Sequence, residues 1–202
     1  MTQPILSSGY HNLPPGTLAN VVTCLEMTAK PKAARPGLPP GLALVGLNRA
    51  DLAAYRALFR KIGADWLWFS RLMMPDAQLA AILAHANVES YALEKDGVAV
   101  GMLELDFRQA GTCELAFFGL ARAAIGTGVG RALMGEAIAM AWAKPITRFW
   151  VHTCTYDHPA ALGFYRRSGF RPYALMVEVH GDPRLTGALP EDAAPHVALI
   201  RS

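Results

Sequence analysis

The sequence has few cysteines and no long apolar run, and each absence excludes a class of protein. Its three cysteines, Cys24, Cys113 and Cys154, are odd in number and lack metal-ligand spacing, which favours free thiols in a reducing cytoplasm over a disulfide framework. No apolar segment approaches the roughly 18 residues that a transmembrane helix needs. The first residues show no basic region followed by an apolar core, so we expect no signal peptide.

Charge is also sparse. The net charge is +3, and the basic residues are dispersed instead of forming a stripe with aromatic residues, so we expect no nucleic-acid partner. The histidines stand mostly singly, and we expect no metal site. A hydrophobic fraction of 52% is typical of a globular chain with its own core. We predict a flexible arm over residues 1–17, where prolines and glycines recur, and a single domain over residues 18–202.

A glycine-rich turn stands near the middle of the chain, with the sequence Ile-Gly-Thr-Gly-Val-Gly-Arg over residues 125–131. The apolar run at residues 115–120 predicts a buried strand before it, and the spacing of Val129, Leu133 and Ala137 predicts a helix after it. Glycine lets the backbone approach a ligand closely, and the free N–H groups at a helix N-terminus suit a phosphate. The turn therefore predicts an anion cradle.

Spacing excludes the two common nucleotide motifs. A dinucleotide fingerprint needs a further glycine where Arg131 or Leu133 stands, and a P-loop needs a Gly-Lys-Ser/Thr triplet that is absent. The remaining pattern resembles the pyrophosphate loop of the GNAT acetyltransferase superfamily, Arg/Gln-x-x-Gly-x-Gly/Ala. Gly128 and Gly130 match it, whereas Ile125 replaces the Arg/Gln. Either Arg122 or Arg131 is a candidate for the missing cation.

A second segment strengthens the resemblance. Residues 158–170 are similar to the family's Asn-x-x-Ala-x-x-Leu/Phe-Tyr-x-x-x-Gly-Phe helix, with His158 in place of the Asn. The resemblance covers roughly residues 88–180. It implies an α/β (α+β) fold with a mixed, mostly antiparallel sheet of six to seven strands and about four helices, and it implies acetyl-CoA as cosubstrate. The residues expected to bind it are Leu120, Arg122, Gly126, Thr127, Gly128, Val129, Gly130, Arg131 and His158.

Residue patterns place further elements around this centre. Strands are expected at residues 20–27, 42–47, 88–95, 98–108, 113–120, 147–155, 170–180 and 196–200, the first two as a hairpin. Helices are expected after an Asn48 cap, over residues 75–85, from 129 into the 140s, and after a cap at Asp157 or His158. Asp96-Gly97 predicts a tight hairpin turn.

Acetyl transfer to an amine needs a base, an acid and a donor for the oxyanion. The resemblance implies Tyr165 as general acid, with a packed tyrosine as the alternative, and a backbone N–H near residues 118–120 where the strand bulges. It also implies that this strand separates from its neighbour and leaves a slot for the pantetheine arm. Glu114 is the candidate base, and the alternatives are a surface strand glutamate or one of the rivals Glu104, Asp106 and His152.

An aromatic segment after the first helix covers the acceptor site in this family's layout. Trp66 and Trp68 either form an acceptor pocket or fill the core, and Arg71 either pairs with an acceptor carboxylate or is a solvated surface residue. His152 joins the acceptor set, with a core histidine as the alternative. The predicted function is N-acetylation of a small, amino-acid-like primary amine by a cytoplasmic enzyme that forms a homodimer. The alternatives are a protein or peptide acceptor and a non-catalytic acyl-CoA-binding module.

Overall fold

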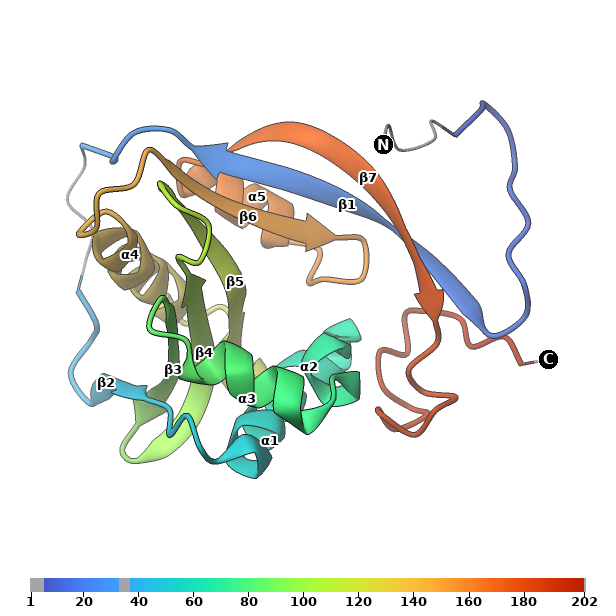
Figure 1. Ribbon diagram of the computed structural model, residues 1–202, viewed down its shortest axis with the longest axis horizontal. Coiled ribbons are helices and arrows are strands. Elements are labelled where there is room, and N and C mark those ends of the chain that lie inside the picture. The colour runs from blue at the N-terminus through green and yellow to red at the C-terminus, as the bar shows by residue number, and fades with distance from the viewer. Residues whose placement is uncertain (1–5, 33–36, 202) are drawn as a thin grey trace.

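A computed structural model describes residues 6–32 and 37–201 of the chain. These residues form a seven-stranded sheet in the order β2-β3-β4-β5-β6-β1-β7 (Figure 1). The strands are β1 (Thr17–Met27), β2 (Leu42–Gly46), β3 (Val88–Lys95), β4 (Val98–Asp106), β5 (Thr112–Leu120), β6 (Arg148–Cys154) and β7 (Arg171–Gly181). The α-helices are α1 (Leu52–Gly63), α2 (Ser70–Met73), α3 (Asp76–Ala84), α4 (Val129–Ala141) and α5 (Ala161–Arg167). The predicted α/β class and mostly antiparallel sheet are confirmed, with five α-helices among the described residues instead of about four.

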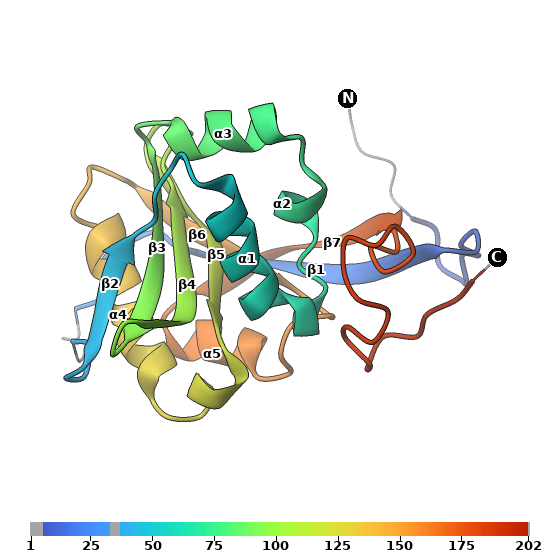
Figure 2. The same ribbon diagram turned by 90° about the horizontal axis from the view of Figure 1, so that it is seen from below.

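Helices cover both faces of the sheet (Figure 2). On one face, α1 and α3 bury Tyr55, Phe59 and Leu79 against β3 and β4. On the other face, α4 and α5 pack Leu133 and Tyr165 against the central strands. These two apolar clusters stabilise the sheet from both sides, since burying each aliphatic or aromatic side chain contributes about 1.5–3 kcal/mol to the free energy of folding. Within the described ranges, no helix is long and apolar enough to cross a membrane.

The strands β5 and β6 run parallel but pair over a short stretch. Their register covers Thr112 to Glu114 on β5 and Arg148 to Trp150 on β6. Beyond these residues, β5 stays paired with β4, and β6 stays paired with β1. The expected separation of the two strands is therefore confirmed. The register shift on β5 falls between Leu115 and Phe117, so the bulge lies at Ala116 and not near residues 118–120.

Two predictions about strands are wrong, one about a hairpin and one about a final strand. The first two strands form no hairpin, because β1 lies between β6 and β7 whereas β2 pairs with β3 at the far edge. Short-range patterns identify a strand but not its partner. Residues 196–200 form no strand. The Arg184 guanidinium binds the carbonyls of Ala193, Val197 and Ala198, so these acceptors serve a side chain instead of a sheet.

The predicted caps are shifted. Asn48 accepts from the Ala50 N–H, and Asp51 is the residue that caps α1, with its carboxylate 2.9 Å from the Ala54 nitrogen. The α5 helix begins at Ala161, with no side-chain cap from Asp157 or His158.

The Asp96-Gly97 turn is confirmed, with φ of 50° and 78°. Residues 6–16 of the predicted arm form no helix or strand; residues 1–5, and residues 33–36 of the next loop, lie outside the described residues.

Candidate active site

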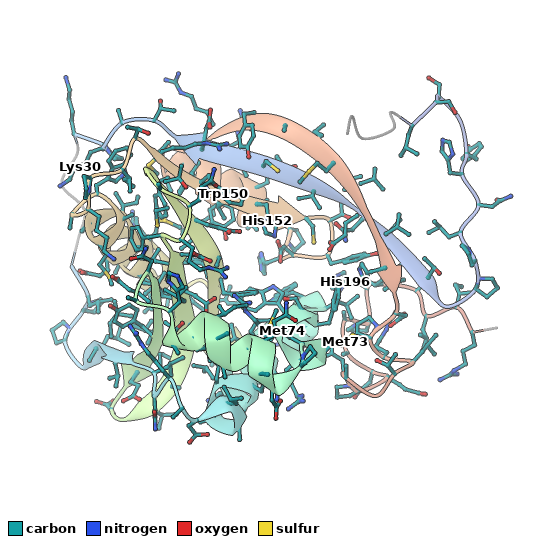
Figure 3. The ribbon with its side chains drawn as sticks, viewed as in Figure 1. Lys30, Met73, Met74, Trp150, His152 and His196 are labelled. Atoms are coloured by element: carbon teal, nitrogen blue, oxygen red, sulfur yellow. The ribbon has the colours of Figure 1, made fainter. Side chains whose placement is uncertain are left out.

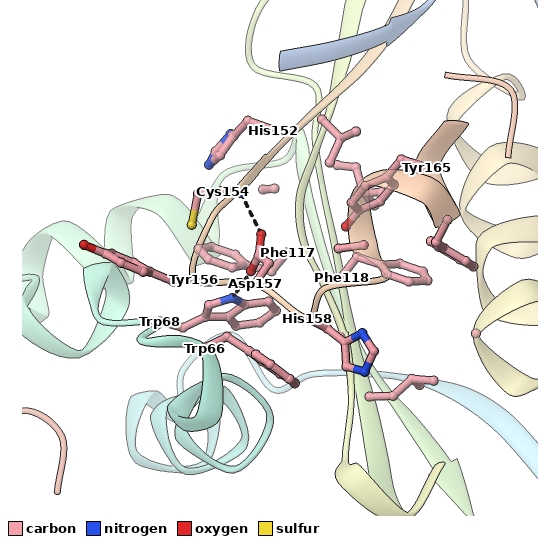
Figure 4. Close-up of a pocket in the computed structure, with 18 of the residues that line it drawn as sticks. Trp66, Trp68, Phe117, Phe118, His152, Cys154, Tyr156, Asp157, His158 and Tyr165 are labelled. Atoms are coloured by element: carbon pink, nitrogen blue, oxygen red, sulfur yellow. Dashed lines mark hydrogen bonds between the residues drawn. The ribbon is translucent and has the colours of Figure 1, made fainter. Parts of the chain in front are cut away.

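A cavity of about 710 Å³ opens where β5 and β6 separate (Figure 4). One wall is β5 from Glu114 to Leu120, and the other is β6 with the turn that follows it. The start of α4 and the helix α5 line one end, and β1 and β7 line the other. The connection between α1 and α2 contributes the remaining wall. Segments distant in sequence thus share one concave space, the usual setting for a ligand.

The glycine-rich turn has a backbone that favours glycine at two positions. Gly126 and Gly128 have φ of 81° and 87°, in the left-handed region where other residues are strained. Gly128 is the N-cap residue of α4, and the helix has no side-chain cap, so its first N–H groups are available to a ligand. A Cβ built on either glycine would meet nothing within 4 Å. This open, donor-rich backbone fits a pyrophosphate.

The residues predicted to bind the cosubstrate divide into two groups. Those that line the cavity are Leu120, Gly126, Gly128, Gly130, Arg131 and His158. The others, Arg122, Thr127 and Val129, are not among its lining residues. The Thr127 hydroxyl donates to the Ala124 carbonyl, and Val129 packs against the core.

Of the two candidate cations, Arg131 lines the cavity, whereas Arg122 is 80% exposed and pairs with Asp65 at 2.9 Å. Sequence reasoning missed a third, Arg167, which lines the cavity from α5. Neither Arg131 nor Arg167 forms an ion pair with any other described residue. This end of the cavity therefore carries positive charge that no acidic side chain neutralises.

Glu114 stands where β5 and β6 begin to separate. Burial, with the nearby Asp106 as a smaller cause, raises the pKa of Glu114 to about 7. His152 Nδ1 lies 3.7 Å from its Oε1. A carboxylate with this pKa is half deprotonated near neutral pH, which suits a general base.

The rival carboxylates are already occupied. Glu104 is fully buried and binds the Arg71 guanidinium and the Tyr55 hydroxyl, each at 2.7 Å. Asp106 binds Arg108; burial acts to raise its pKa, but the hydrogen bonds from Arg108 outweigh burial and lower it. Each of these carboxylates is committed to an arginine, whereas Glu114 has no arginine partner among the described residues and its pKa is raised by burial.

Tyr165 projects from α5 into the cavity (Figure 4). It is 7% exposed, and its ring packs edge-on against Phe118 and Phe170. Burial, reinforced by the charge of Asp157, raises the pKa of the phenol above its ordinary value, so the phenol keeps its proton at neutral pH. No hydrogen bond joins its hydroxyl to another described residue, which leaves the proton available to a ligand.

Both tryptophans line the cavity. The Trp68 ring also packs against Phe59 and Phe117, and its Nε1 donates to Asp157 at 3.4 Å. Trp68 thus belongs to the core and to the cavity wall at once. Trp66 meets the ring of His158 edge-on at 5.2 Å, and Figure 4 shows it beside Trp68 on the same wall.

For Arg71 and His152, the structure excludes one alternative each: a solvated surface position for Arg71 and a core position for His152. Arg71 is 7% exposed, so it is not a solvated surface residue, and its charge is paired with Glu104. His152 is not a core histidine, because its side chain is 49% exposed and lines the cavity. Figure 3 shows His152 on β6.

Sequence reasoning missed the end of the cavity formed by β1 and β7. Asn20, Tyr156, Glu178 and His180 line it. A polar Asn in the apolar start of β1, and the alternation of Glu178 and His180 on β7, were the available signals. Among the described residues, no group of three or more His, Cys, Asp or Glu side chains is arranged to hold a metal ion.

Comparisons with known proteins agree with this geometry. The acetyltransferase (GNAT) family matches residues 55–170, more than half of the chain, whereas no curated protein matches. The structure is similar to a GCN5-related N-acetyltransferase from Sphaerobacter thermophilus, with TM-score 0.58 and 15% identity over 83% of this chain and 52% of that one. A GCN5-related N-acetyltransferase from Kribbella flavida has TM-score 0.54 and 20% identity over 85% and 63%.

An aminoglycoside acetyltransferase from an uncultured soil metagenomic sample has TM-score 0.52 and 20% identity over 64% of this chain and 88% of that one. At these identities the structural similarities show the fold alone, and the chain spans between half and two-thirds of the Sphaerobacter and Kribbella proteins. The family match itself includes the glycine-rich turn, Glu114 and Tyr165. The chain belongs to the GNAT family of acetyltransferases.

Proposed function

We propose that this enzyme moves an acetyl group directly from acetyl-CoA to the primary amine of a small molecule. The observation that carries the proposal is a single cavity with a donor-rich glycine turn, a carboxylate of near-neutral pKa and a buried tyrosine. The reaction forms the amide C–N bond, breaks the thioester C–S bond, and releases coenzyme A and a proton. The turn at residues 125–131, with Arg131 and Arg167, binds the pyrophosphate.

Glu114 takes the proton that the ammonium group must lose before it attacks, either directly or through a water molecule. Tyr165 gives its proton to the departing thiolate. A phenol is ordinarily a weaker acid than a thiol, but a thiolate in the same buried space is also desolvated, which raises the pKa of its thiol. Burial raises the pKa of Cys154 to about 11 and raises that of Cys113 further above its usual value, so neither thiol favours an acyl-enzyme.

A small acceptor is supported by the walls of the cavity, since Trp66, Phe69 and Tyr156 line its acceptor end. A structurally similar aminoglycoside acetyltransferase was solved with sisomicin. An amino-acid-like acceptor would find one free N–H on Arg71, its buried Nε, because the Arg71 charge is paired with Glu104. We therefore define the proposed substrate by its primary amine and not by a carboxylate.

The test is release of thiol from acetyl-CoA with a panel of amino acids, polyamines, aminoglycosides and peptides. Turnover with one class of small amine, abolished by Tyr165→Phe, is the expected result. Turnover with peptides alone would replace the small-molecule acceptor by a protein. Binding of acetyl-CoA without release of thiol for any amine would favour the non-catalytic module. Membership of an acetyltransferase family offers that alternative no support.

We also propose a cytoplasmic homodimer. All three cysteines are free thiols, as a reducing compartment requires. The strand β7 is a sheet edge, and on its face opposite the cavity Leu175, Val177 and Val179 are exposed, Leu175 by 71%. A long apolar edge strand readily pairs with another chain. Light scattering on the eluting protein should give a dimer mass for the wild type and a monomer mass for Val177→Lys; a monomeric wild type would refute the dimer.

A further inference from the structure

Three polar side chains form a cluster where β1 and β7 line the cavity. Asn20 on β1 pairs across the strands with Glu178 on β7, and Leu18 pairs with His180. Residues two apart on a strand share a face, so Asn20, Glu178 and His180 share one side of the β1–β7 ribbon, and all three line the cavity. We call these three residues the ribbon cluster.

Every polar atom that the ribbon cluster leaves without a partner is a hydrogen-bond acceptor. Asn20 is 3% exposed, and its Nδ2 donates to Glu178 Oε2 at 2.9 Å. A carboxylate requires a donor, so Asn20 Oδ1 is the free atom, and it is buried without a partner among the described residues. His180 Nδ1 contacts the Gly181 carbonyl at 2.8 Å and must carry the hydrogen. In the neutral ring Nε2 is then an acceptor, and it too is buried and unpartnered.

The unpaired charges at the two ends of the cavity have opposite signs. Glu178 forms no ion pair with any other described residue, and the Asn20 amide is a neutral partner. At the opposite end, Arg131 and Arg167 are unpaired cations. The cavity therefore attracts anions at the glycine turn and cations at the ribbon cluster.

Two aromatic rings pack against His180 of the ribbon cluster. Phe69 lies 4.4 Å from the His180 ring, and Tyr156 meets it edge-on at 6.1 Å. Such rings pack against methylene groups and attract a cation over their faces. Buried acceptors cost free energy when no donor reaches them, so a group rich in N–H bonds is the ligand that this end of the cavity suits.

We propose that the ribbon cluster binds a second cationic group of the acceptor, an ammonium or guanidinium joined by an aliphatic chain to the amine that is acetylated. This inference rests on the proposed function, which supplies the reacting amine. On the neighbouring strand β6, Cys154 also lines the cavity. Asn20 lies one strand across and two residues along from Cys154, a spacing of about 8 Å in a sheet. A substrate with one amine beside β6 could place a second cationic group at the ribbon cluster, so the proposal makes diamines and polyamines better substrates than monoamines.

The experiment compares α,ω-diaminoalkanes from butane to octane with monoamines of the same chain length. In the wild type, the best diamine should have a KM about tenfold below that of its monoamine. Glu178→Gln removes the charge but keeps the shape, and it should raise the KM for the diamine about tenfold. The KM for the monoamine, the KM for acetyl-CoA and the Tm should stay unchanged.

Glu94→Gln is the matched control, because it makes the same chemical change on β3 away from the cavity. Equal KM values for diamine and monoamine in the wild type, or identical behaviour of the two variants, would overturn the inference while leaving the acetyl transfer intact. If no amine is acetylated, calorimetric titration of the diamine still decides the matter. Binding that Glu178→Gln weakens supports the ribbon cluster, and binding that it leaves unchanged refutes it.

Discussion

The two ends of the cavity are built in different ways. At the glycine turn, the groups available to a ligand are mainly backbone N–H groups within residues 125–131, positioned by two left-handed glycines and the start of α4. At the acceptor end, side chains as distant in sequence as Asn20 and His180 meet across β1, β6, β7 and the α1–α2 connection. A backbone site recognises what all substrates share, whereas a side-chain site can be changed residue by residue and sets specificity.

Because the two ends differ, changes at each end should affect a different kinetic constant. Changes at the glycine turn should act on the KM for acetyl-CoA, and changes at the acceptor end should act on the KM for the amine. Glu114 and Tyr165 are the proposed base and acid, and their loss should act on kcat, because a general base and a general acid contribute in the transition state.

The largest effect is expected at the proposed general acid. Tyr165→Phe removes one hydroxyl and keeps the ring that packs against Phe118 and Phe170. Loss of a general acid should lower kcat about 1,000-fold with both KM values nearly unchanged. Steady-state thiol release measures this, with Tyr10→Phe in the exposed N-terminal segment as control. A KM change without a kcat change would assign Tyr165 to binding instead.

Glu114→Gln should lower kcat about 100-fold and alter the pH profile. The wild-type rate should rise with pH through about 7, because burial raises the pKa of Glu114 to about 7 and the base must be deprotonated. The variant should lack this limb. A limb that persists in Glu114→Gln would point to another group, with His152, 3.7 Å away, as the first to replace.

The same carboxyl affects the stability of the fold. Its folded pKa lies above its ordinary value of 4.5, so the folded state binds the proton more tightly than the unfolded state. This contribution is fully present below pH 4.5 and is lost as the pH rises through about 7. The Tm of the wild type should therefore fall over this range more than that of Glu114→Gln.

The glycine turn was predictable from the sequence, whereas the ribbon cluster was not. Glycine spacing places the turn, because φ preference and helix N-termini are properties of adjacent residues. The ribbon cluster depends on β1 lying between β6 and β7, and strand partners are not encoded in short patterns. The burial of Arg71 was missed for the same reason, since its partner Glu104 lies 33 residues away.

At the turn itself, Gly128→Ala should act on one substrate only. Alanine at φ of 87° is strained by about 1–2 kcal/mol, and the N–H groups at the start of α4 shift. The KM for acetyl-CoA should rise about tenfold, while that for the amine stays constant. Gly187→Ala is the matched control, because φ there is 73° and nothing lies within 4 Å, yet Gly187 is not among the residues that line the cavity. Equal KM values in the two variants would exclude the turn from cosubstrate binding.

The smallest effect distinguishes the two arginines beside the turn. Arg131→Ala removes an unpaired cation that lines the cavity and should raise the KM for acetyl-CoA about threefold to fivefold. Arg122→Ala removes an exposed side chain held by Asp65 and should leave this KM unchanged. Added salt should shrink the Arg131 effect, since an exposed charge is screened over about 10 Å at 0.1 M. A larger effect at Arg122 would mean that it leaves Asp65 to bind the cosubstrate, and side-chain charge would then contribute from outside the cavity.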